Sequence, residues 1–366
     1  MSPNKRTGRK RDYVGVLSSV FAIVIGLLVG FVILLICNPS QALPGFVTIL
    51  TGAFTHGLKG VGQVFYYATP IILTGLSVGF AFKTGLFNIG TPGQFIVGAF
   101  AAVYVGIMWT GLGRIQWAVA LLAAILGGAL WGMVPGVLKA CFNVNEVIAS
   151  IMMNYIGMYM VNWIVKSYKP LFNNLRNESR NVAATAQIPK MGMDKLFPES
   201  SVGGGILLAV AAVLLIWVIL NKTTFGYELK AVGFNRDAGR YAGINEKRNI
   251  IMSMVIAGAI AGMAGGLLYL AGTGKHIEIK DVLAPEGFTG ISVALLGLSH
   301  PIGVLFSGLF IAYLTAGGFY LQLFEFSTEI IDIIVAVIIY FSAFALIVKT
   351  ILTRMNRKRE KGGGRT

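Results

Sequence analysis

The sequence predicts an all-α polytopic membrane protein with about ten transmembrane helices. Hydrophobic residues make up 55% of its 366 residues and charged residues only 12%, whereas a soluble domain carries roughly 25% charged residues. Several uncharged apolar runs, among them 14–37, are long enough to cross ~30 Å of hydrocarbon as a helix. The short alternating segments of a membrane β-barrel are not found in the sequence.

The apolar segments number ten in chain order. The eighth is short and rich in glycine, so it either crosses the membrane or re-enters it. The predicted segments are 14–36, 62–82, 93–112, 117–139, 146–166, 203–220, 249–271, 286–298, 301–320 and 329–350.

Positive charge is concentrated at the two ends of the chain. The net charge is +15, and Lys and Arg cluster in 1–13 before the first segment and in 351–366 after the last. Basic flanks are typical of cytoplasmic segments, so we expect both termini in the cytoplasm, which ten crossings allow. The same placement argues against a nucleic-acid partner. We expect a single transmembrane domain over 1–366.

Two polar segments between the predicted helices stand out. The segment 167–202 carries several asparagines and three prolines, so we expect an external cap or docking surface. The segment 221–248 mixes both charge signs, glycines and apolar residues. It is either an ordinary solvated loop or one or two short cytoplasmic helices that dock a partner, and its apolar content favours the second interpretation.

Motifs for catalysis, metal binding or nucleotide binding are not found in the sequence. The string 271–277 lacks the first glycine and the Ser or Thr of a phosphate-binding loop. The three histidines lack metal-ligand spacing, and Cys37 and Cys141 do not suggest a disulfide framework. We therefore expect neither an enzyme nor a metal site, and no cofactor bound by this chain.

The stretch 85–100 lies between two long apolar segments and contains helix-breaking residues and amides. Its glycines and Pro92 prevent one continuous helix. Broken backbone at membrane depth survives only where protein or a water-filled cavity satisfies its polar groups. The stretch is either part of a solute path that offers uncharged hydrogen bonds, or a tight turn whose amides cap helix ends. The candidate path residues are Phe87, Asn88, Thr91 and Gln94.

Two polar residues of the segment 146–166 are also candidates for the path. Glu146 either caps the start of a helix or is an intramembrane acid, free or paired with Lys139 or Lys83. Asn154 lies deeper in the same segment, where a hydrogen bond between helices is the favoured role and solute contact the alternative.

A second interrupted stretch, 286–304, lies in the other half of the chain. Glu286 suits a helix N-terminus, and Phe288 and Thr289, with Ser292, suit a flat solute that carries hydroxyl groups. Paired interruptions in two halves indicate an inverted repeat with a solute path at its interface.

Four strings, 85–100, 145–156, 226–248 and 286–297, together resemble one family of membrane subunits. The family comprises the permeases of bacterial ABC importers for ribose, other simple sugars and branched-chain amino acids. Within it, the sequence is most similar to nucleoside permeases of the guanosine and uridine type. The resemblance runs from about residue 60 to 345, in order and in spacing.

The resemblance implies a multi-pass subunit of the bacterial plasma membrane that works with three kinds of partner. One is a second permease, often a different chain. Another is an ATPase with two nucleotide-binding halves, which would use ATP in place of this chain. The third is an external, lipid-anchored solute-binding protein of the basic-membrane-protein type.

The resemblance also implies a coupling segment for the ATPase within 226–248. An ATPase moves a permease through a compact surface element held in its groove, and short helices with glycine hinges suit that task. The residues that match the family's coupling segment are Gly226, Lys230, Gly233, Asn235, Ala238, Arg240, Tyr241 and Gly243.

Several functions remain open from the sequence. The favoured one is nucleoside import by alternating access, and ribose or another simple sugar is the nearest alternative. A branched-chain amino acid would need fixed partners for both of its charged ends, which the deep segments scarcely offer. An ion-coupled secondary transporter and a scaffolding membrane protein are the alternatives of other classes, and the segment 221–248 disfavours both through the resemblance.

Overall fold

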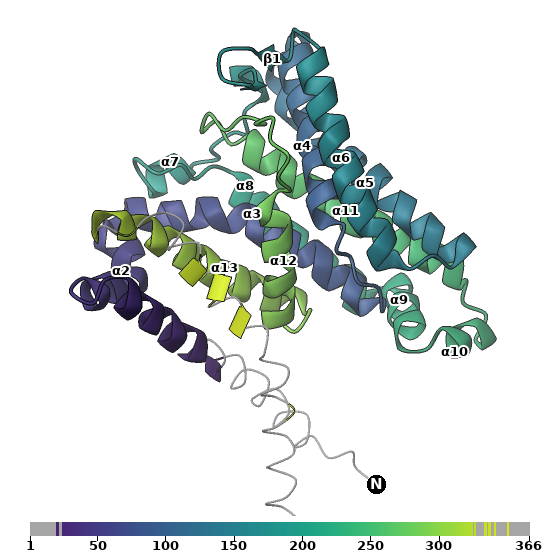
Figure 1. Ribbon diagram of the computed structural model, residues 1–366. Helices are drawn as coiled ribbons and strands as arrows, with labels where there is room; N and C mark the ends of the chain where they lie inside the picture. Colours follow the sequence, from purple (N-terminus) through teal and green to yellow (C-terminus); the bar gives the residue numbers. More distant parts are fainter. Residues whose placement is uncertain are drawn as a thin grey trace, which may run out of the picture. The chain divides into compact units, whose positions relative to one another are not determined.

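The structure is a computed structural model that describes residues 20–21, 24–324, 326, 333–334, 336–337, 340–341 and 350. The chain forms two compact units, Phe54–Tyr313 and the pairing of Met1–Ala53 with Leu314–Thr366. The described residues are mostly helical (Figure 1). The elements are α2 (Ala42–Thr55), α3 (Gly57–Lys83), α4 (Thr91–Met108), η1 (Thr110–Ile115), α5 (Gln116–Phe142), α6 (Glu146–Ser167), β1 (Phe172–Asn173), β2 (Glu178–Ser179), η2 (Ala184–Ala186), α7 (Met193–Leu196), α8 (Gly205–Lys222), α9 (Thr224–Phe234), α10 (Arg236–Tyr241), α11 (Glu246–Tyr269), α12 (Pro285–Leu296), α13 (Pro301–Phe319) and η3 (Tyr320–Phe324).

Among the described residues, seven helices are long and apolar enough to cross a membrane. They coincide with seven of the predicted segments, and the chain is a multi-pass membrane protein. Of the other three, 14–36 is described only in part, as the short apolar helix Val24–Cys37, and most of 329–350 lies outside the described residues. The total of ten crossings therefore stays a prediction, as does the placement of the basic ends 1–13 and 351–366.

The remaining predicted segment, 286–298, forms the short helix α12. Its 12 residues would extend about 18 Å at 1.5 Å per residue, less than the ~30 Å hydrocarbon thickness. A turn follows it directly and leads into α13. Helix α12 is thus too short to cross on its own.

Helix α2 was not predicted from the sequence. It has 14 residues, fewer than the ~20 that a full span needs, so a search for spans passes over it. In its own unit α2 packs on the end of α13 and on the residues that follow. Gly317 meets the backbone of Ile49, and a methyl group at Gly45 would lie 3.0 Å from the ring of Phe326.

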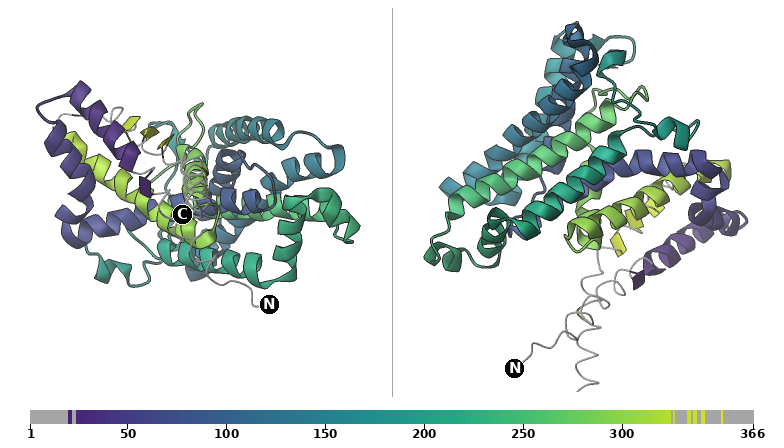
Figure 2. Two further views of the ribbon diagram at one scale, coloured as in Figure 1. Left: turned by 90° about the horizontal axis from the view of Figure 1, so that it is seen from below. Right: turned by 180° about the vertical axis from the view of Figure 1, so that it is seen from behind.

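Helix α11 forms the core of the larger unit, where it packs against α3, α4 and α5. Helices α4, α5, α6 and α11 run alongside one another (Figure 1, Figure 2). Glycines allow the backbones of α5 and α11 to touch, because Gly128 faces both Gly258 and Gly262 without an intervening side chain. Gly98 brings α4 to the same point on α11. Such small-residue contacts are typical of helix packing in lipid, where van der Waals contact replaces the hydrophobic effect.

We predict that Gly262→Ala destabilises the protein, although alanine is the better helix former. A methyl group at Gly262 would collide with the carbonyl oxygen of Ala124 and with the backbone of Gly128. Overpacking of this kind costs about 1–3 kcal/mol. Thermal unfolding in detergent should therefore show a lower melting temperature for this variant than for the wild type.

The matched control is Gly111→Ala, because a methyl group at Gly111 meets no atom within 4 Å. Equal melting temperatures for the two variants would show that the α5–α11 contact does not limit stability.

Candidate translocation site and coupling surface

The predicted interruption at 85–93 is confirmed. Helix α3 ends at Lys83 and α4 begins at Thr91, with Pro92 in its first turn, where the missing amide hydrogen costs no hydrogen bond. Gly85 between them has a φ of +70°, in the left-handed region that favours glycine. The side chains of Asn88, Thr91 and Gln94 are buried at this point, at most 1% exposed.

The side-chain amides of Asn88 and Gln94 in the interruption form two hydrogen bonds with each other. Asn88 Nδ2 donates to Gln94 Oε1 at 2.9 Å, and Gln94 Nε2 donates to Asn88 Oδ1 at 3.1 Å. Asn88 Nδ2 also lies 3.4 Å from Ser77 Oγ on α3, and Asn88 Oδ1 accepts the amide hydrogen of Gly90 at 3.2 Å. Asn88 thereby joins the end of α3, the turn and the first turn of α4. In this conformation the hydrogen bonds of the pair are made within the protein.

Asn154 ties α6 to the same interruption. Its Oδ1 accepts the amide hydrogen of Gly93 at 2.9 Å, and its Nδ2 donates to the carbonyl of Ile89 at 2.9 Å. It satisfies one backbone group in the turn before α4 and one in the first turn of α4. Asn154 therefore makes the hydrogen bond between helices that was the favoured role, and solute contact by it stays a prediction.

Sequence reasoning missed Ser150. Its hydroxyl is fully buried beside Gly90 and has no hydrogen-bond partner among the described residues. Ser150 and Asn154 are four residues apart on α6, so they share a helix face, and this spacing is the signal that would have identified it. A buried hydroxyl without a partner costs free energy, so Ser150 is a group that a rearranged interruption or a bound molecule would stabilise.

Glu146 pairs with Lys139, which was one of the alternatives. Glu146 Oε2 lies 2.8 Å from Lys139 Nζ, and their side chains are only 16% and 14% exposed. The pair closes the turn between α5 and α6. Asn145 caps α6 by accepting the amide hydrogen of Val147 at 2.9 Å. Arg236, the first residue of α10, also interacts electrostatically with the Glu146 carboxylate.

The two interrupted stretches meet in space. Gly287 in the first turn of α12 lies against the start of α4, since a methyl group there would be 2.6 Å from the Cα of Pro92. The next turn of α12 packs on α3, where Gly290 lies against the backbone of Thr74. The starts of α4 and α12 are therefore neighbours, although almost two hundred residues separate them in the sequence.

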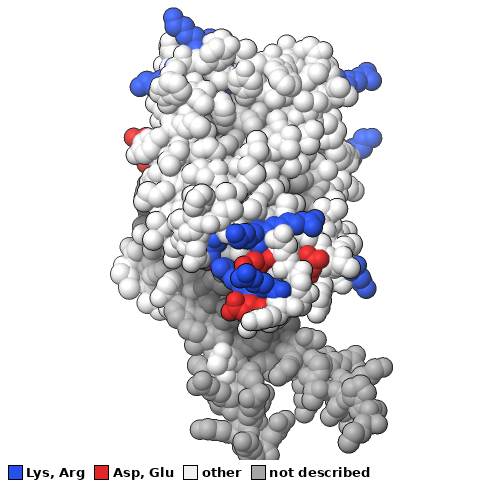
Figure 3. Space-filling model, turned by 90° about the vertical axis from the view of Figure 1, so that its right-hand side faces the viewer, with Lys and Arg blue, Asp and Glu red and all other residues white. Residues whose placement is uncertain are grey.

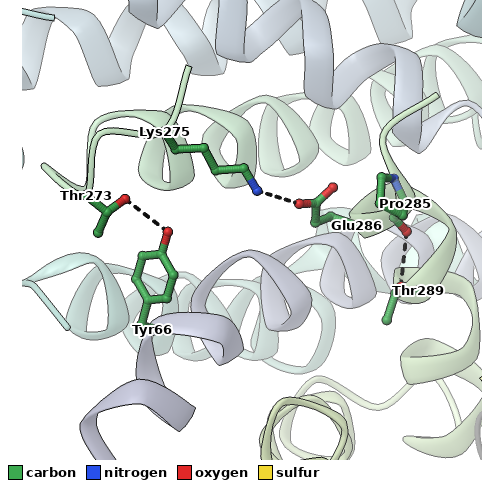
Figure 4. Close-up of polar contacts among 6 residues, drawn as sticks. All are labelled: Tyr66, Thr273, Lys275, Pro285, Glu286 and Thr289. Atoms are coloured by element: carbon green, nitrogen blue, oxygen red, sulfur yellow. Dashed lines mark hydrogen bonds and ion pairs between the residues drawn. The ribbon is translucent and has the colours of Figure 1, made fainter. Parts of the chain in front are cut away.

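The polar groups at the start of α12 have partners within the chain (Figure 4). Glu286 Oε1 lies 3.0 Å from Lys275 Nζ, and Thr289 Oγ1 donates to the carbonyl of Pro285 at 3.1 Å. Phe288 is 40% exposed, and Ser292 lies one helical turn further along on the same face and is half-buried. Phe288 and Ser292 thus form the open face of α12.

Phe87 makes its ring contact with α3 and not with the other candidate path residues. Its ring stacks on that of Phe82, with centroids 5.3 Å apart and planes at 24°. Solute contact by each of the predicted path residues stays a prediction.

The predicted short helices of 221–248 are confirmed as α9 and α10. Thr223 caps α9 by accepting the amide hydrogen of Gly226 at 3.1 Å, and Asn235 caps α10 by accepting that of Ala238 at 3.0 Å. Gly243 ends the second helix with a φ of +80°. Gly226 packs against the end of α8, Lys230 is half-buried, and Ala238 and Arg240 are exposed.

The outer surface of α9 and α10 is aromatic and charged. Phe234 is 90% exposed and Tyr241 94%, and Tyr227 is also exposed. In Figure 3, which views the side where these helices lie, Lys, Arg, Asp and Glu gather in one patch on a surface otherwise largely without charge. The charged residues of this segment and its borders are Lys222, Glu228, Lys230, Arg236, Asp237, Arg240, Glu246, Lys247 and Arg248.

The inner surface of α9 is fixed to the membrane helices. Val232 packs in a buried cluster with Leu86 of the interruption and Met254 of α11. Asn249 Nδ2 of α11 donates to Glu228 Oε2 at 3.2 Å. Helix α9 is thus anchored to the end of α3 and to α11, while its aromatic side is left open.

Two glycines make a close contact between α9 and the interruption. A methyl group at Gly233 would lie 2.7 Å from the carbonyl oxygen of Lys83, and one at Gly85 would lie 2.9 Å from the carbonyl oxygen of Gly233. Backbone touches backbone here, so no flexible side chain can absorb a displacement of α9.

We predict that Asn88→Ala lowers the melting temperature in detergent. It would leave the buried amide of Gln94 without its partner, a loss of about 1–3 kcal/mol. The double variant Asn88→Ala with Gln94→Ala should lose less than the sum of the two single changes, because the pair acts as a unit.

Asn174→Ala is the control, since Asn174 is exposed on a turn. Additive effects of the two changes in the Asn88–Gln94 pair would argue against mutual support.

The chain is similar along most of its length to known transport proteins. A model of the family described as branched-chain amino acid transport system / permease component matches residues 60–343. The guanosine ABC transporter permease protein NupP of Bacillus subtilis (strain 168) is 38% identical over 340 residues, which are 93% of this chain and 96% of NupP. The nucleoside ABC transporter permease protein NupB of Lactococcus lactis subsp. cremoris is 34% identical over 347 residues, 93% of each chain.

Two more distant relatives bear on the solute and on partners. The glucose ABC transporter permease protein TsgB13 of Haloferax volcanii is 32% identical over 305 residues, 81% of this chain and 78% of TsgB13. A second guanosine permease of Bacillus subtilis, NupQ, is 28% identical over 68% of this chain and 77% of its own length. No solved structure matches.

Because the family model covers most of the chain and two relatives are similar along nearly all of it, the chain belongs to the family of branched-chain amino acid transport system permease components.

Proposed function

We propose that this chain is the membrane-spanning permease subunit of an ATP-driven ABC importer that carries nucleosides across the bacterial plasma membrane. The observation that carries the proposal is the similarity to NupP and NupB over 93% of the chain, because both are named as permeases for guanosine or nucleosides. The subunit works by alternating access and has no covalent chemistry of its own.

The chemistry of the two interruptions supports a neutral solute. They carry amides, hydroxyls and the half-exposed ring of Phe288, while the acids Glu146 and Glu286 are each paired with a lysine. A neutral nucleoside needs uncharged hydrogen-bonding groups and an aromatic surface. Solute contact by Asn88 and Gln94 would require their mutual hydrogen bonds to open.

A simple sugar is the second candidate solute. Sugars also take uncharged hydrogen bonds, and TsgB13 is named as a glucose permease. The flat aromatic side chain of Phe288 and the higher identity to NupP and NupB favour the nucleoside.

The importer would contain three further components. A second permease, a chain similar to NupQ, would complete the path along the open face of α12. An ATPase with two nucleotide-binding halves would bind and hydrolyse ATP in place of this chain. A lipid-anchored binding protein would deliver the solute from outside. The full subunit would cross the membrane ten times, as one domain with an inverted repeat and both ends in the cytoplasm.

The contacts of α9 support a route for coupling. The exposed rings of Phe234 and Tyr241, with Arg240 beside them, would sit in a groove of the ATPase. Movement of α9 would be passed to the interruption through the backbone contact of Gly233 with Gly85. An ion-coupled transporter acting alone would have no use for this docking surface.

We predict that deletion of this gene lowers uptake of labelled guanosine by host cells and that unlabelled ribose or glucose does not compete. Uptake should persist when the ion gradients are collapsed but ATP is maintained. Competition by a sugar at the same concentration as guanosine would favour the sugar permease. Loss of uptake with the ion gradient alone would favour a secondary transporter.

We predict that Gly233→Ala uncouples the ATPase from transport. The added methyl group would press on the backbone of Lys83 and Thr84. A misfit of about 1–3 kcal/mol corresponds to a loss of uptake of roughly 5- to 150-fold. The measurement is guanosine uptake and ATP hydrolysis by the assembled transporter in vesicles, with hydrolysis continuing at near the wild-type rate.

Gly239→Ala is the matched control, because a methyl group at Gly239 would make an ordinary contact at 3.4 Å with Val232. Normal uptake by Gly233→Ala would show that the glycine contact does not transmit the movement. Arg240→Glu should uncouple in the same way by weakening the docking surface itself.

A further inference from the structure

A groove of about 800 Å³ lies at the hairpin formed by β1 and β2. Lys169, Arg176 and Arg180 line it together with His276, three asparagines and a single carboxylate, that of Glu178. The hairpin follows α6, whose 22 residues span about 33 Å. It therefore lies at the opposite end of that helix from α9 and α10 (Figure 1). If α9 and α10 dock a cytoplasmic ATPase, the groove is on the external side.

The walls of the groove are fixed. Ser179 of β2 donates its amide hydrogen to the carbonyl of Ile277 at 2.9 Å, and the Ser179 hydroxyl accepts that of Ile277 at 3.0 Å. The amide of Ile279 donates to the carbonyl of Asn177 at 3.1 Å. Asn162 of α6 holds the same segment through the carbonyl of Lys280 at 3.0 Å. The groove is thus built on a small sheet-like support and not on an independent loop.

The positive charge of the groove is not neutralised within the described chain. Arg176 Nη1 lies 3.8 Å from Glu178 Oε1, but neither Lys169 nor Arg180 pairs with a carboxylate of the described residues. Lys169 and Arg180 are both exposed. Of the guanidinium hydrogens of Arg180, only that on Nε is used in a hydrogen bond to a described residue, donated to the carbonyl of Phe172 at 3.1 Å. The rest of its guanidinium is available for a carboxylate, which it can hold through two parallel hydrogen bonds.

The tip of the hairpin points to a protein as the ligand. Leu175 is 96% exposed at the turn between β1 and β2. A small anion would gain nothing from a fully exposed leucine beside an open groove of this size. A protein surface would gain both the burial of an apolar side chain and pairing with the cations.

We propose that this groove is the docking site for an acidic face of the external solute-binding protein. Carboxylates of that protein enter between Lys169 and Arg180, and Leu175 is buried against its surface. The positive groove also steers the approach of the partner, since opposite charges raise the rate of association at low salt. This inference rests on the proposed function, because it takes the binding protein to be a component of the importer.

The test measures binding of the assembled transporter to the host's basic-membrane-protein type binding lipoprotein, expressed without its lipid anchor. For the wild type we expect the affinity to fall as NaCl rises. Lys169→Glu with Arg180→Glu should weaken binding at low salt by at least roughly tenfold, the equivalent of 1.4 kcal/mol, and flatten the salt dependence. Lys169→Glu alone, which keeps the backbone hydrogen bond from Phe172 to the Lys169 carbonyl, should weaken binding in the same direction.

Lys190→Glu is the matched control, because Lys190 is an exposed cation of the same segment that does not line the groove. Wild-type affinity in the double variant, or an equal loss in Lys190→Glu, would overturn the docking site.

Guanosine uptake by the wild type separates this inference from the proposed function. If uptake is present and the charge reversals do not change binding, only the docking site fails. If the wild type neither imports guanosine nor binds the lipoprotein, both fail.

Discussion

A helix interrupted at membrane depth must satisfy its freed backbone groups with protein, and this constraint organises the larger unit. Between α3 and α4, the side chains of Asn88 and Asn154 supply hydrogen bonds to the backbone of Gly90, Gly93 and Ile89. Because Asn154 is contributed by α6, the interruption is complete only when that helix is packed against α4. The glycine contacts that bring α4, α5 and α11 together are therefore a condition for the site as well as for the fold.

Helix positions could be predicted because the length of an apolar run is a local property of the sequence. Seven predicted segments coincide with helices long enough to cross a membrane, and the short eighth segment is α12. The sequence analysis missed helix α2 because its 14 residues include a proline, two glycines and three threonines, which suit a loop as well as a helix. The helix packs against Gly317, a contact with a distant part of the chain that a local pattern does not reveal.

The residues of the site could be predicted from the sequence, but their hydrogen-bond partners could not. The helix-breaking residues and the amides at 85–94 identified the interruption. The two hydrogen bonds between Asn88 and Gln94 could not be predicted, because they depend on how the first turn of α4 is rotated. Ser150 shows a signal that was available, because its spacing from Asn154 places both on one face of α6. The contact of Gly85 with Gly233 had no such signal, since it joins distant segments through backbone alone.

Contacts within the larger unit link its two polar ends through the interruptions. Lys275, in the loop between α11 and α12, pairs with Glu286, whose neighbour Gly287 lies on Pro92. Pro92 opens α4 beside the Asn88–Gln94 pair, and the same turn reaches Gly233 through Gly85. At the contact of Gly233 with Gly85, backbone meets backbone and no side chain can deform. A displacement of α9 must therefore either move the turn between α3 and α4 or break the contact of Gly233 with Gly85. If that turn moves, α12 must move with it, or Gly287 separates from Pro92. Such an element has a few discrete arrangements instead of a continuous range, which is what alternating access requires of a gate.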